Sequence, residues 1–388
     1  MNDTERPLEQ RGDWLFPTEI RFGVDRIGEL GMLCRRLGLA RPLIVTDRGL
    51  AATPLPERVQ AAAAGPGVSP RLFAEVQENP TGNNVEDGVA AFHDWKADGV
   101  IALGGGSGLD CGKTIALLAA RGGSLWRFAW PGHESAQQEG GAYPIIAIPT
   151  TAGTGAEVEP SAIITDKQGP VKRAILHPAM LPKAVIADPR LTTSMPAGLT
   201  AATGMDALSH GLEALCVRSF HPMADSIALA GIGLVGRWLP VALREPQNLE
   251  ARSFMMAAAI MGATAFGKGL GAMHALSHAI GALHGYHHGL TNAVLMPYVL
   301  DYNRPAIAAA VSNLADALHL SGDGFTAVRQ WVVDLRRQVG VPENLAKLGL
   351  RSDRFDAISG LAARDICAEM NPVPVDAAAL KAILISAG

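Results

Sequence analysis

The sequence has few cysteines, and they lie far apart. Cys34, Cys111, Cys216 and Cys367 are the only four in 388 residues, and they form no CxxC pair. This spacing suits neither a disulfide framework nor a thiolate metal site. We therefore expect four buried thiols that pack as small apolar side chains.

Charged residues are also scarce. They make up 18% of the chain, the net charge is −4, and lysines and arginines form no cluster. Because nucleic-acid binding relies on a basic surface, this composition excludes the usual electrostatic footprint for that partner. We expect the partner to be a small molecule.

No uninterrupted apolar run is long enough to span a bilayer. The longest lies around residues 255–266, and the polar N-terminal sequence MNDTERPLEQRGD has no apolar core of the kind found in signal peptides. The sequence therefore predicts a soluble, cytoplasmic protein without a membrane partner.

The first half of the chain has the pattern of a parallel sheet. Apolar, β-rich runs at 43–46, 71–75, 100–103 and 144–148 alternate with helical patterns. The first three begin 28 and 29 residues apart (71 − 43 and 100 − 71), close to the length of a βαβ unit. Between two of them, Asn83 or Asn84 is expected to cap a helix through VEDGVAAFHDW. Helices should cover this sheet.

The second half has a different pattern, and the length of the chain allows two domains. A last strand at 184–187 is followed by ADPRLTTSMP, and after about Leu191 nearly every segment has apolar residues at helical spacing. We therefore predict an α/β, Rossmann-like domain over residues 1–190 and an all-helical domain over residues 191–388.

A glycine-rich segment follows the strand at 100–103. In GVIALGGGSGLDCGK the strand leads into three glycines, Ser107, and a helix expected to open near Asp110. Free backbone NH groups at a helix start, with no Cβ in the way, form an anion site suited to a pyrophosphate. Ser107 stands where a Walker loop needs its first glycine, and Leu109 where GxGxxG needs its last. The segment is either another type of phosphate cradle or a tight turn without a ligand.

Two further features lie at the same carboxyl edge of the predicted sheet, where open α/β folds bind ligands. The loop PTTAGTGAE at 149–157 offers Thr150, Thr151 and Thr154 as donors to phosphate or ribose oxygens. Asp47, which ends the RPLIVTD strand, can accept both ribose hydroxyls of NAD and would repel the 2′-phosphate of NADP. It can equally be the N-cap of a helix beginning near Leu50.

Five of the eleven histidines lie between residues 274 and 288. His274 and His278 are four residues apart, as are Asp206 and His210 on an earlier helix, so each pair shares a helix face. Any one of these histidines could be a hydrogen-bonded core residue. Together, imidazoles and a carboxylate favour Fe(II), Zn(II) or a related first-row metal over Mg²⁺ or Ca²⁺.

A nucleotide site in one domain and a metal in the other predict a reacting centre between the two domains. Hydride transfer fits this arrangement best, because the metal would lower the pKa of an alcohol and the nicotinamide would carry the hydride.

Several segments together have a familiar pattern: ENPT at 78–81, GGGSGLDCGK, PTTAGTGAEVE, ADPRL, GMDALSHGLEA, GAMHALSHAIGA, HHGLTNAVLMPYV and the C-terminal NPVPV. They resemble the iron-containing, or group III, alcohol dehydrogenase family, and the similarity runs through essentially the whole chain. The resemblance implies the dehydroquinate synthase-like architecture of that family. It also implies an NAD(P)-dependent enzyme that forms a homodimer, with residues 14–22 as the contact.

The resemblance also assigns the metal site. It implies that Asp206, His210, His274 and His288 hold Fe²⁺, with Zn²⁺ as the alternative. It implies that His278 is not a ligand but relays protons near the nicotinamide.

The resemblance further implies an NAD site, with NADP left open. It places Gly105, Gly106 and Ser107 at the pyrophosphate and Asp47 at the adenosine ribose. The remaining cofactor contacts that it implies are Asn79, Asp110, Thr150, Thr151, Thr154 and Lys172.

Two departures from the family pattern matter. His287 stands where a proline is common, so two adjacent imidazoles compete for the last ligand position; Gly289 after His288 favours His288. The run GKGLGAM before His274 is one residue shorter than the asparagine-bearing run of better-known members. The substrate and the roles of His284 and His287 therefore stay open.

The leading hypothesis is the interconversion of a small primary alcohol or hydroxy acid with its aldehyde or ketone. A hydroxyacid-oxoacid transhydrogenase or a maleylacetate-type reductase of the same fold is the alternative. From other classes, the same features suit a metal-dependent lyase that uses NAD transiently, or a binding module with structural metal and nucleotide.

Overall fold

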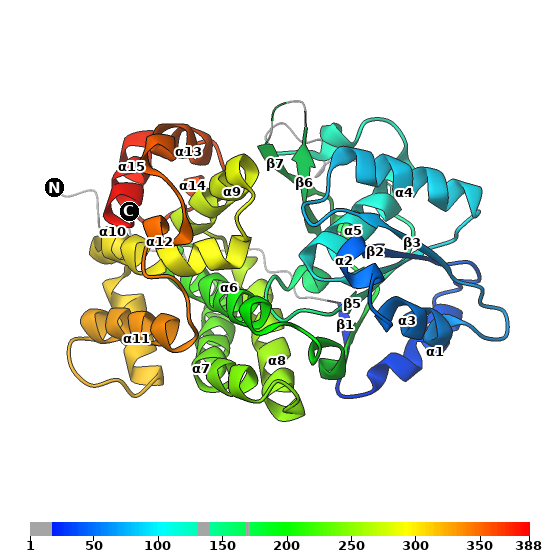
Figure 1. Ribbon diagram of the computed structural model, residues 1–388, viewed down its shortest axis with the longest axis horizontal. Helices are drawn as coiled ribbons and strands as arrows, with labels where there is room; N and C mark the ends of the chain where they lie inside the picture. The colour runs from blue at the N-terminus through cyan, green and yellow to red at the C-terminus, as the bar shows by residue number, and fades with distance from the viewer. Residues whose placement is uncertain (1–17, 131–139, 168, 170) are drawn as a thin grey trace. The chain divides into compact units, whose positions relative to one another are not determined.

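The computed structural model describes residues 18–130, 140–167, 169 and 171–388 (Figure 1). The chain divides after Ser194 into two compact units. We call the described residues 18–194 the sheet unit and residues 195–388 the helical unit. The sequence placed the division at residue 190, within the same irregular segment.

A six-stranded parallel sheet forms the centre of the sheet unit, in the order β1-β8-β5-β4-β2-β3. Its strands are β1 (Glu19–Phe22), β2 (Leu43–Asp47), β3 (Arg71–Val76), β4 (Val100–Gly104), β5 (Ile145–Pro149) and β8 (Ala184–Ala187). β4, β5 and β8 are buried along their whole length, as expected for strands covered on both faces. The predicted parallel sheet is thus confirmed, and the five predicted strands agree to within one residue at each end.

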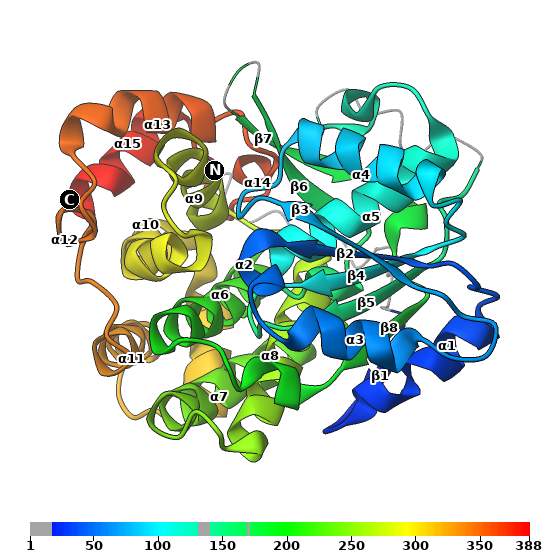
Figure 2. The same cartoon turned by 45° about the vertical axis from the view of Figure 1, so that its right-hand side comes forward.

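One face of the sheet is covered by α1 (Leu30–Arg36) and α3 (Leu55–Ala63). Ile101 and Leu103 of β4 point to this face and share a core with both helices. The other face is covered by α4 (Gly82–Asp94) and α5 (Gly106–Arg121), as Figure 2 shows. Alternate side chains of one strand therefore serve two different cores.

The order of strands reverses beside β2. The chain passes from β2 to β3 on one side, and the next strand, β4, then pairs with β2 on the other side. In open α/β sheets such a reversal, at the carboxyl ends of the strands, is where ligands bind. Asp47 ends β2 and the glycine loop follows β4, so both lie at this position.

Three strands were missed from the sequence: the edge strand β1 and an antiparallel hairpin of β6 (Ser161–Asp166) and β7 (Val171–Leu176). β1 is only four residues long and has no fully buried position. The hairpin strands are half-buried along most of their length, so they lack a strong apolar run. Their strand conformation depends on pairing with a neighbour rather than on local pattern.

Two predicted helix starts were wrong. Thr81, not Asn83 or Asn84, caps α4, and Asn84 completes a capping box by accepting from the Thr81 backbone. The helix of the glycine loop opens at Gly106, four residues before Asp110, so α5 begins within the glycine run itself.

The helical unit, all of whose residues are described, contains only helices, which confirms the predicted all-α half (Figure 1). They are α6 (Ala197–Cys216), α7 (Pro222–Arg244), α8 (Leu249–Phe266), α9 (Ala272–His284), α10 (His288–Ala317), α11 (Gly324–Gln338), α12 (Leu345–Leu348), α13 (Phe355–Ala362), α14 (Ile366–Glu369) and α15 (Ala377–Ser386). α6 is buried throughout from Thr200 to Cys216 and packs against α7, α8 and α10. It is the central helix of this unit.

Among the described residues, α7 alone is long and apolar enough to cross a membrane by length and composition, with a mean hydropathy of 1.6. The prediction instead named residues 255–266, which lie in α8, as the longest apolar run. α7 packs along α6 and α8, and 44% of its apolar window is buried. These contacts are those of a core helix in a bundle.

Candidate functional site

Four predicted metal ligands meet in the helical unit. Asp206 and His210 lie one turn apart on α6, His274 lies on α9, and His288 is the first residue of α10. One ligand atom from each lies within 4.8 Å of the other three. Three of these residues are buried, and the His288 side chain is 23% exposed. The cluster therefore joins donors from three helices at a site with one partly open side.

Glycines allow the helices to approach one another at this cluster. A Cβ at Gly289 of α10 would lie 2.4 Å from the Ala202 carbonyl oxygen and 2.7 Å from the Asp206 Cβ. A Cβ at Gly262 of α8 would lie 3.1 Å from the Cβ of His210. Since real Cβ atoms do not come as close as 2.4 Å, glycine at position 289 is a requirement of the packing.

The ring nitrogens of His274 are oriented by a carboxylate. Nδ1 of His274 lies 2.5 Å from Oε2 of Glu213. Burial is the largest influence on the pKa of His274 and lowers it, but Glu213 and Asp206 outweigh burial and raise this pKa above its usual value. The negative potential that holds a proton on this imidazole is equally suited to a cation.

The amide nitrogen of Asn292 lies within hydrogen-bond distance of four atoms in and beside the cluster. Nδ2 of Asn292 lies 3.0 Å from Oδ1 of Asp206 and 3.3 Å from Oγ of Ser209. The same nitrogen lies 3.2 Å from Nε2 of His274 and 3.1 Å from Nε2 of His288. An amide NH₂ has two hydrogens, so it cannot serve four acceptors. One carboxylate and three imidazoles with ligand atoms this close together fit a first-row divalent metal.

His278 lies beside the cluster without belonging to it. Its ring stacks on that of His288, with centroids 5.1 Å apart, and its Nδ1 lies 2.9 Å from Oδ2 of Asp365. Burial is the largest influence on the pKa of Asp365 and raises it, but His278 and the Cys367 backbone NH outweigh burial and lower it. Asp365 therefore stays ionised and holds Nδ1 of His278, which turns Nε2 away from this contact. Cys367 completes a second group of donors, with burial raising its thiol pKa well above the usual value.

The other two histidines of the run lie outside both groups. His287 is exposed and precedes α10, whereas the adjacent His288 begins the helix and faces Asp206 at 3.6 Å. His284 is half-buried near the end of α9, and burial lowers its pKa. The geometry thus separates the two adjacent imidazoles that the sequence left in competition.

The predicted nucleotide-binding residues gather at the carboxyl edge of the sheet unit, where β5, β4 and β2 are neighbours. Gly105 lies against Thr151, whose Cγ2 would be 3.1 Å from an added Cβ. Gly106 lies against Thr154 at the same distance. An added Cβ at Gly104 would lie 3.3 Å from Oδ2 of Asp47. The glycine loop, the threonine loop and Asp47 therefore form one continuous surface, while Thr150 itself is buried.

The start of α5 is free of side-chain caps. Its N-cap is Gly105, and among the described residues no side chain caps its first NH groups, in contrast to the capping box of α4. Ser107 donates its hydroxyl to the Glu78 carbonyl, which ties the helix start to the segment that holds Asn79. Uncapped NH groups at a glycine-rich start of a 16-residue helix fit a pyrophosphate.

The structure is compatible with both predicted roles of Asp47, as the N-cap of a helix and as an acceptor for the ribose hydroxyls. Oδ1 accepts from the Leu50 NH at 2.9 Å and caps α2 (Arg48–Ala51), while Oδ2 faces Gly104. One carboxylate oxygen thus serves the fold, and the other remains beside the glycine loop.

Asp110 lies inside the helix and not in the glycine loop that precedes it. It lies in the second turn of α5, where it accepts from the Ile163 NH at 2.9 Å and pairs with Lys113 at 3.1 Å. Burial raises the pKa of Asp110. Lys172, half-buried on β7, has a pKa lowered by burial, which Asp110 and Glu78 oppose.

Sequence reasoning missed Lys113. This fully buried lysine donates to the backbone carbonyls of Ala156, Glu159 and Ser161 and so holds the segment after the threonine loop. Its place three residues after Asp110 on one helix face was the available signal.

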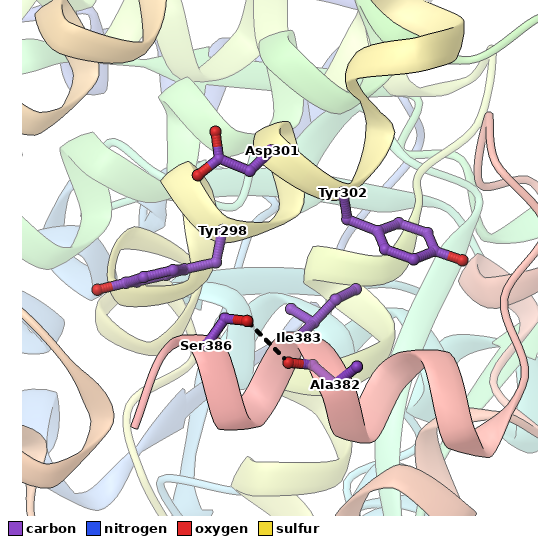
Figure 3. Close-up of a pocket in the computed structure, with 6 residues that line it drawn as sticks. All are labelled: Tyr298, Asp301, Tyr302, Ala382, Ile383 and Ser386. Atoms are coloured by element: carbon purple, nitrogen blue, oxygen red, sulfur yellow. Dashed lines mark hydrogen bonds between the residues drawn. The ribbon is translucent and has the colours of Figure 1, made fainter.

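A small cavity in the helical unit, about 190 Å³ in volume, lies between α10 and α15 (Figure 3). Its lining residues are Tyr298, Asp301, Tyr302, Ala382, Ile383 and Ser386. Both tyrosine hydroxyls donate to backbone carbonyls, and Asp301 pairs with Arg329. Tyr298 lies ten residues along α10 from His288, which is about 15 Å of helix. The cavity is therefore separate from the donor cluster.

Comparisons with known proteins cover both units. Residues 17–189 match a family model described as iron-containing alcohol dehydrogenase, and residues 200–388 match the model of that family's C-terminal region. The chain is 39% identical to a 4-hydroxybutyrate dehydrogenase from Cupriavidus necator, over 95% of this chain and 97% of the relative. It is 33% identical to an NAD-dependent methanol dehydrogenase from Bacillus methanolicus, over 93% and 95% of the two chains.

Two solved structures are similar to this one over nearly the whole chain. A crystal structure of 1,3-propanediol oxidoreductase is 33% identical with a TM-score of 0.93, covering 97% of this chain and 99% of the other. A sulfoacetaldehyde reductase from Bifidobacterium kashiwanohense, in complex with NAD⁺, is 29% identical with a TM-score of 0.87, covering 97% and 98%.

Proposed function

Since the chain belongs to the iron-containing alcohol dehydrogenase family, we propose that it interconverts a small primary alcohol or hydroxy acid with the matching aldehyde or ketone, using NAD. The observation that carries this proposal is the convergence of Asp206, His210, His274 and His288, whose ligand atoms lie within 4.8 Å of one another. The helical unit is the catalytic, metal-binding domain in this proposal, and the sheet unit binds the dinucleotide.

The four donors would hold Fe²⁺, or Zn²⁺ in its place. When bound, such a metal supplies Lewis-acid polarisation of the substrate oxygen. Because Asp206 would be the only carboxylate among the four donors, a divalent ion held there would keep part of its positive charge and would favour a substrate oxygen in its anionic form.

His278 moves the proton in this proposal. Asp365 holds Nδ1, so Nε2 is the nitrogen that exchanges a proton with the substrate hydroxyl. The His278 side chain is 15% exposed, which gives the proton a route to solvent.

The glycine and threonine loops bind the cofactor. The uncapped NH groups at Gly106 and Ser107 receive the pyrophosphate, and Thr151 and Thr154 border it. Asp47 accepts from the ribose hydroxyls, which favours NAD over NADP. The rest of the cofactor contacts Asn79, which lies in the bend before α4, and Lys172. Asp110 supports the glycine loop from within α5.

The relatives suggest a terminal hydroxyl on a short chain as the substrate. Their names specify 4-hydroxybutyrate, methanol and 1,3-propanediol. A hydroxy acid and a simple alcohol differ in one anionic group, so a panel of both separates them.

The test is elemental analysis of anaerobically purified protein, followed by NADH absorbance on the same sample with 4-hydroxybutyrate, 1,3-propanediol, ethanol and methanol. We expect bound iron or zinc, and NADH formation that a chelator abolishes. Protein without a transition metal, unresponsive to added Fe(II) and Zn(II), would refute the mechanism. Activity that is unaffected by chelation would favour the alternative of a metal-independent reductase of the same fold.

We also propose a cytoplasmic homodimer. The predicted contact at residues 14–22 lies partly outside the described residues, but β1 forms one edge of the sheet and pairs only with β8 among the described strands. Phe22 and Val24 beside this edge are exposed. An exposed strand edge with apolar side chains favours pairing with a second chain. Light scattering on the purified protein tests the mass.

A further inference from the structure

Glu213 is a buried carboxylate that takes no part in the proposed reaction. It lies on α6, three residues after His210, and is 5% exposed. We propose that Glu213 is the positioning residue of the metal site, which holds His274 so that its Nε2 faces the other ligands. This inference rests on the proposed metal site.

The first argument concerns the tautomer of His274. A carboxylate only accepts hydrogen bonds, so the His274 nitrogen that faces it, Nδ1 at 2.5 Å, must carry the hydrogen. Nε2 then presents its lone pair toward Asp206 and His288. Carboxylate partners of this kind orient histidine ligands and raise their basicity in metal sites generally.

The second argument concerns the rigidity of the carboxylate. Besides His274, Oε2 accepts from the Gly271 NH at 3.0 Å, and Oε1 accepts from the Met273 NH at 2.8 Å. Gly271 is the N-cap of α9 and has no side chain to cap the helix, so Glu213 does this from α6. Three hydrogen bonds at two oxygens leave the carboxylate no alternative orientation.

The third argument concerns the close approach at Gly271. A Cβ at this position would lie 3.0 Å from Oε1 of Glu213 and 2.7 Å from Oδ1 of Asn371. The start of α9 is therefore shaped to receive both side chains. Through Glu213, the helix of Asp206 and His210 is attached directly to the helix of His274.

Asn371 provides a matched control. Its Oδ1 accepts from the Ala272 NH at 3.0 Å, so it also caps α9, and its amide pairs with that of Asn303. Among the described residues, Asn371 forms no hydrogen bond with an imidazole. Comparing the two positions separates helix capping from histidine positioning.

The test uses metal-free full-length protein and its affinity for Zn(II), measured by competition with a chromophoric chelator. In Glu213→Gln the new amide can turn its NH₂ toward Nδ1, which moves the imidazole hydrogen to Nε2 and blocks the ligand atom. We expect Glu213→Gln to weaken Zn(II) binding about 10- to 100-fold. We expect its Co(II) derivative to show changed visible absorption bands, since the ligand field would change.

We expect Asn371→Ala to lower the melting temperature of the metal-free protein while its Zn(II) affinity stays within about threefold of the unchanged protein. Glu213→Asp keeps a carboxylate on a shorter side chain and should bind Zn(II) with intermediate affinity. If Glu213→Gln does not fold, Glu213→Asp is compared with Asn371→Ala in its place.

Equal Zn(II) affinity of the Glu213→Gln variant and the unchanged protein would overturn the inference, as would an equal loss in Asn371→Ala. Unchanged protein that binds no metal would instead overturn the proposed function, so the two failures are distinguishable.

Discussion

The proposed nucleotide-binding edge of the sheet unit and the proposed metal centre of the helical unit are built in different ways. The edge consists of backbone turns and half-exposed side chains, each supplied by a short segment that follows a strand. The centre consists of three buried side chains and the partly exposed His288, from three helices, and it depends on glycines that let those helices approach one another. A change at the edge should therefore remove only the cofactor contacts of one segment, whereas a change in the centre should affect the whole donor set.

The largest expected effect is in the metal centre, at His288. His288→Ala removes a donor whose Nε2 faces Asp206, so we expect loss of bound metal. Without the metal, the enzyme would lose several kcal/mol of stabilisation of the charge that develops in the transition state. This loss corresponds to a fall in kcat/KM of roughly 10³-fold or more.

His287→Ala is the control, because His287 is exposed and adjacent in sequence. Metal analysis and NADH formation should be unchanged in this variant. Loss of metal in His287→Ala with retention in His288→Ala would reverse the assignment of the two imidazoles.

The next effect is at the nucleotide edge. Gly106→Val places a branched side chain where Thr154 already lies 3.1 Å from an added Cβ, at the uncapped start of α5. Losing two phosphate contacts of about 1.5 kcal/mol each would raise the KM for NAD about 100-fold. Metal content should not change, which sharpens the contrast with His288→Ala.

Gly360→Val serves as the control for Gly106→Val, because an added Cβ at Gly360 lies within 4 Å of no atom of the described residues outside its own helix turn. Its KM for NAD should equal that of the unchanged protein. If Gly106→Val also left this KM unchanged, the phosphate cradle would lie elsewhere.

A smaller effect is expected at Asp47. Asp47→Ser retains a side-chain oxygen to cap α2 but loses the charge beside Gly104. Without the charge-assisted contact to ribose and the repulsion of a 2′-phosphate, the ratio of kcat/KM for NADP to that for NAD should rise about tenfold. Steady-state rates with both cofactors measure this ratio, and an unaltered ratio would mean that Asp47 serves only as a cap.

The last prediction concerns stability rather than activity, and it tests a buried titratable carboxyl in the sheet unit. Burial raises the pKa of Glu157, which is 2% exposed and ends the threonine loop, to about 7. The folded state therefore keeps this proton from about pH 4.5, where the unfolded chain loses it, up to about pH 7. Stability should decline across that window, by at most about 3 kcal/mol, and remain low above it.

Glu157→Gln removes this titration. Its melting temperature should exceed that of the unchanged protein at pH 8 and equal it near pH 4.5. Thermal unfolding across this range measures the difference, and parallel pH profiles of the two proteins would contradict the prediction.

The sequence predicted the parts of both sites whose pattern is local. Asp206 and His210, or His274 and His278, are four residues apart, and helix geometry alone places each pair on one face. The apolar runs of β2, β4 and β5 were readable because these strands are buried on both faces. β1 was missed because it pairs with β8, which is distant in the chain. The hairpin strands β6 and β7 were missed because half or more of the positions in each are only partly buried and give no continuous apolar run. Thr81 and Asn84 are both good capping residues, so local chemistry could not choose between them.

By itself, the sequence determined the class of fold and the two pairs of residues that share a helix face, Asp206 with His210 and His274 with His278, because each follows from spacing along one element. Tertiary structure alone decided which of two adjacent histidines faces the cluster, and it brought Glu213 to His274 across 61 positions of sequence. Those outcomes depend on how α6, α9 and α10 pack. Helix packing is set by contacts between side chains far apart in the chain, which no local pattern encodes.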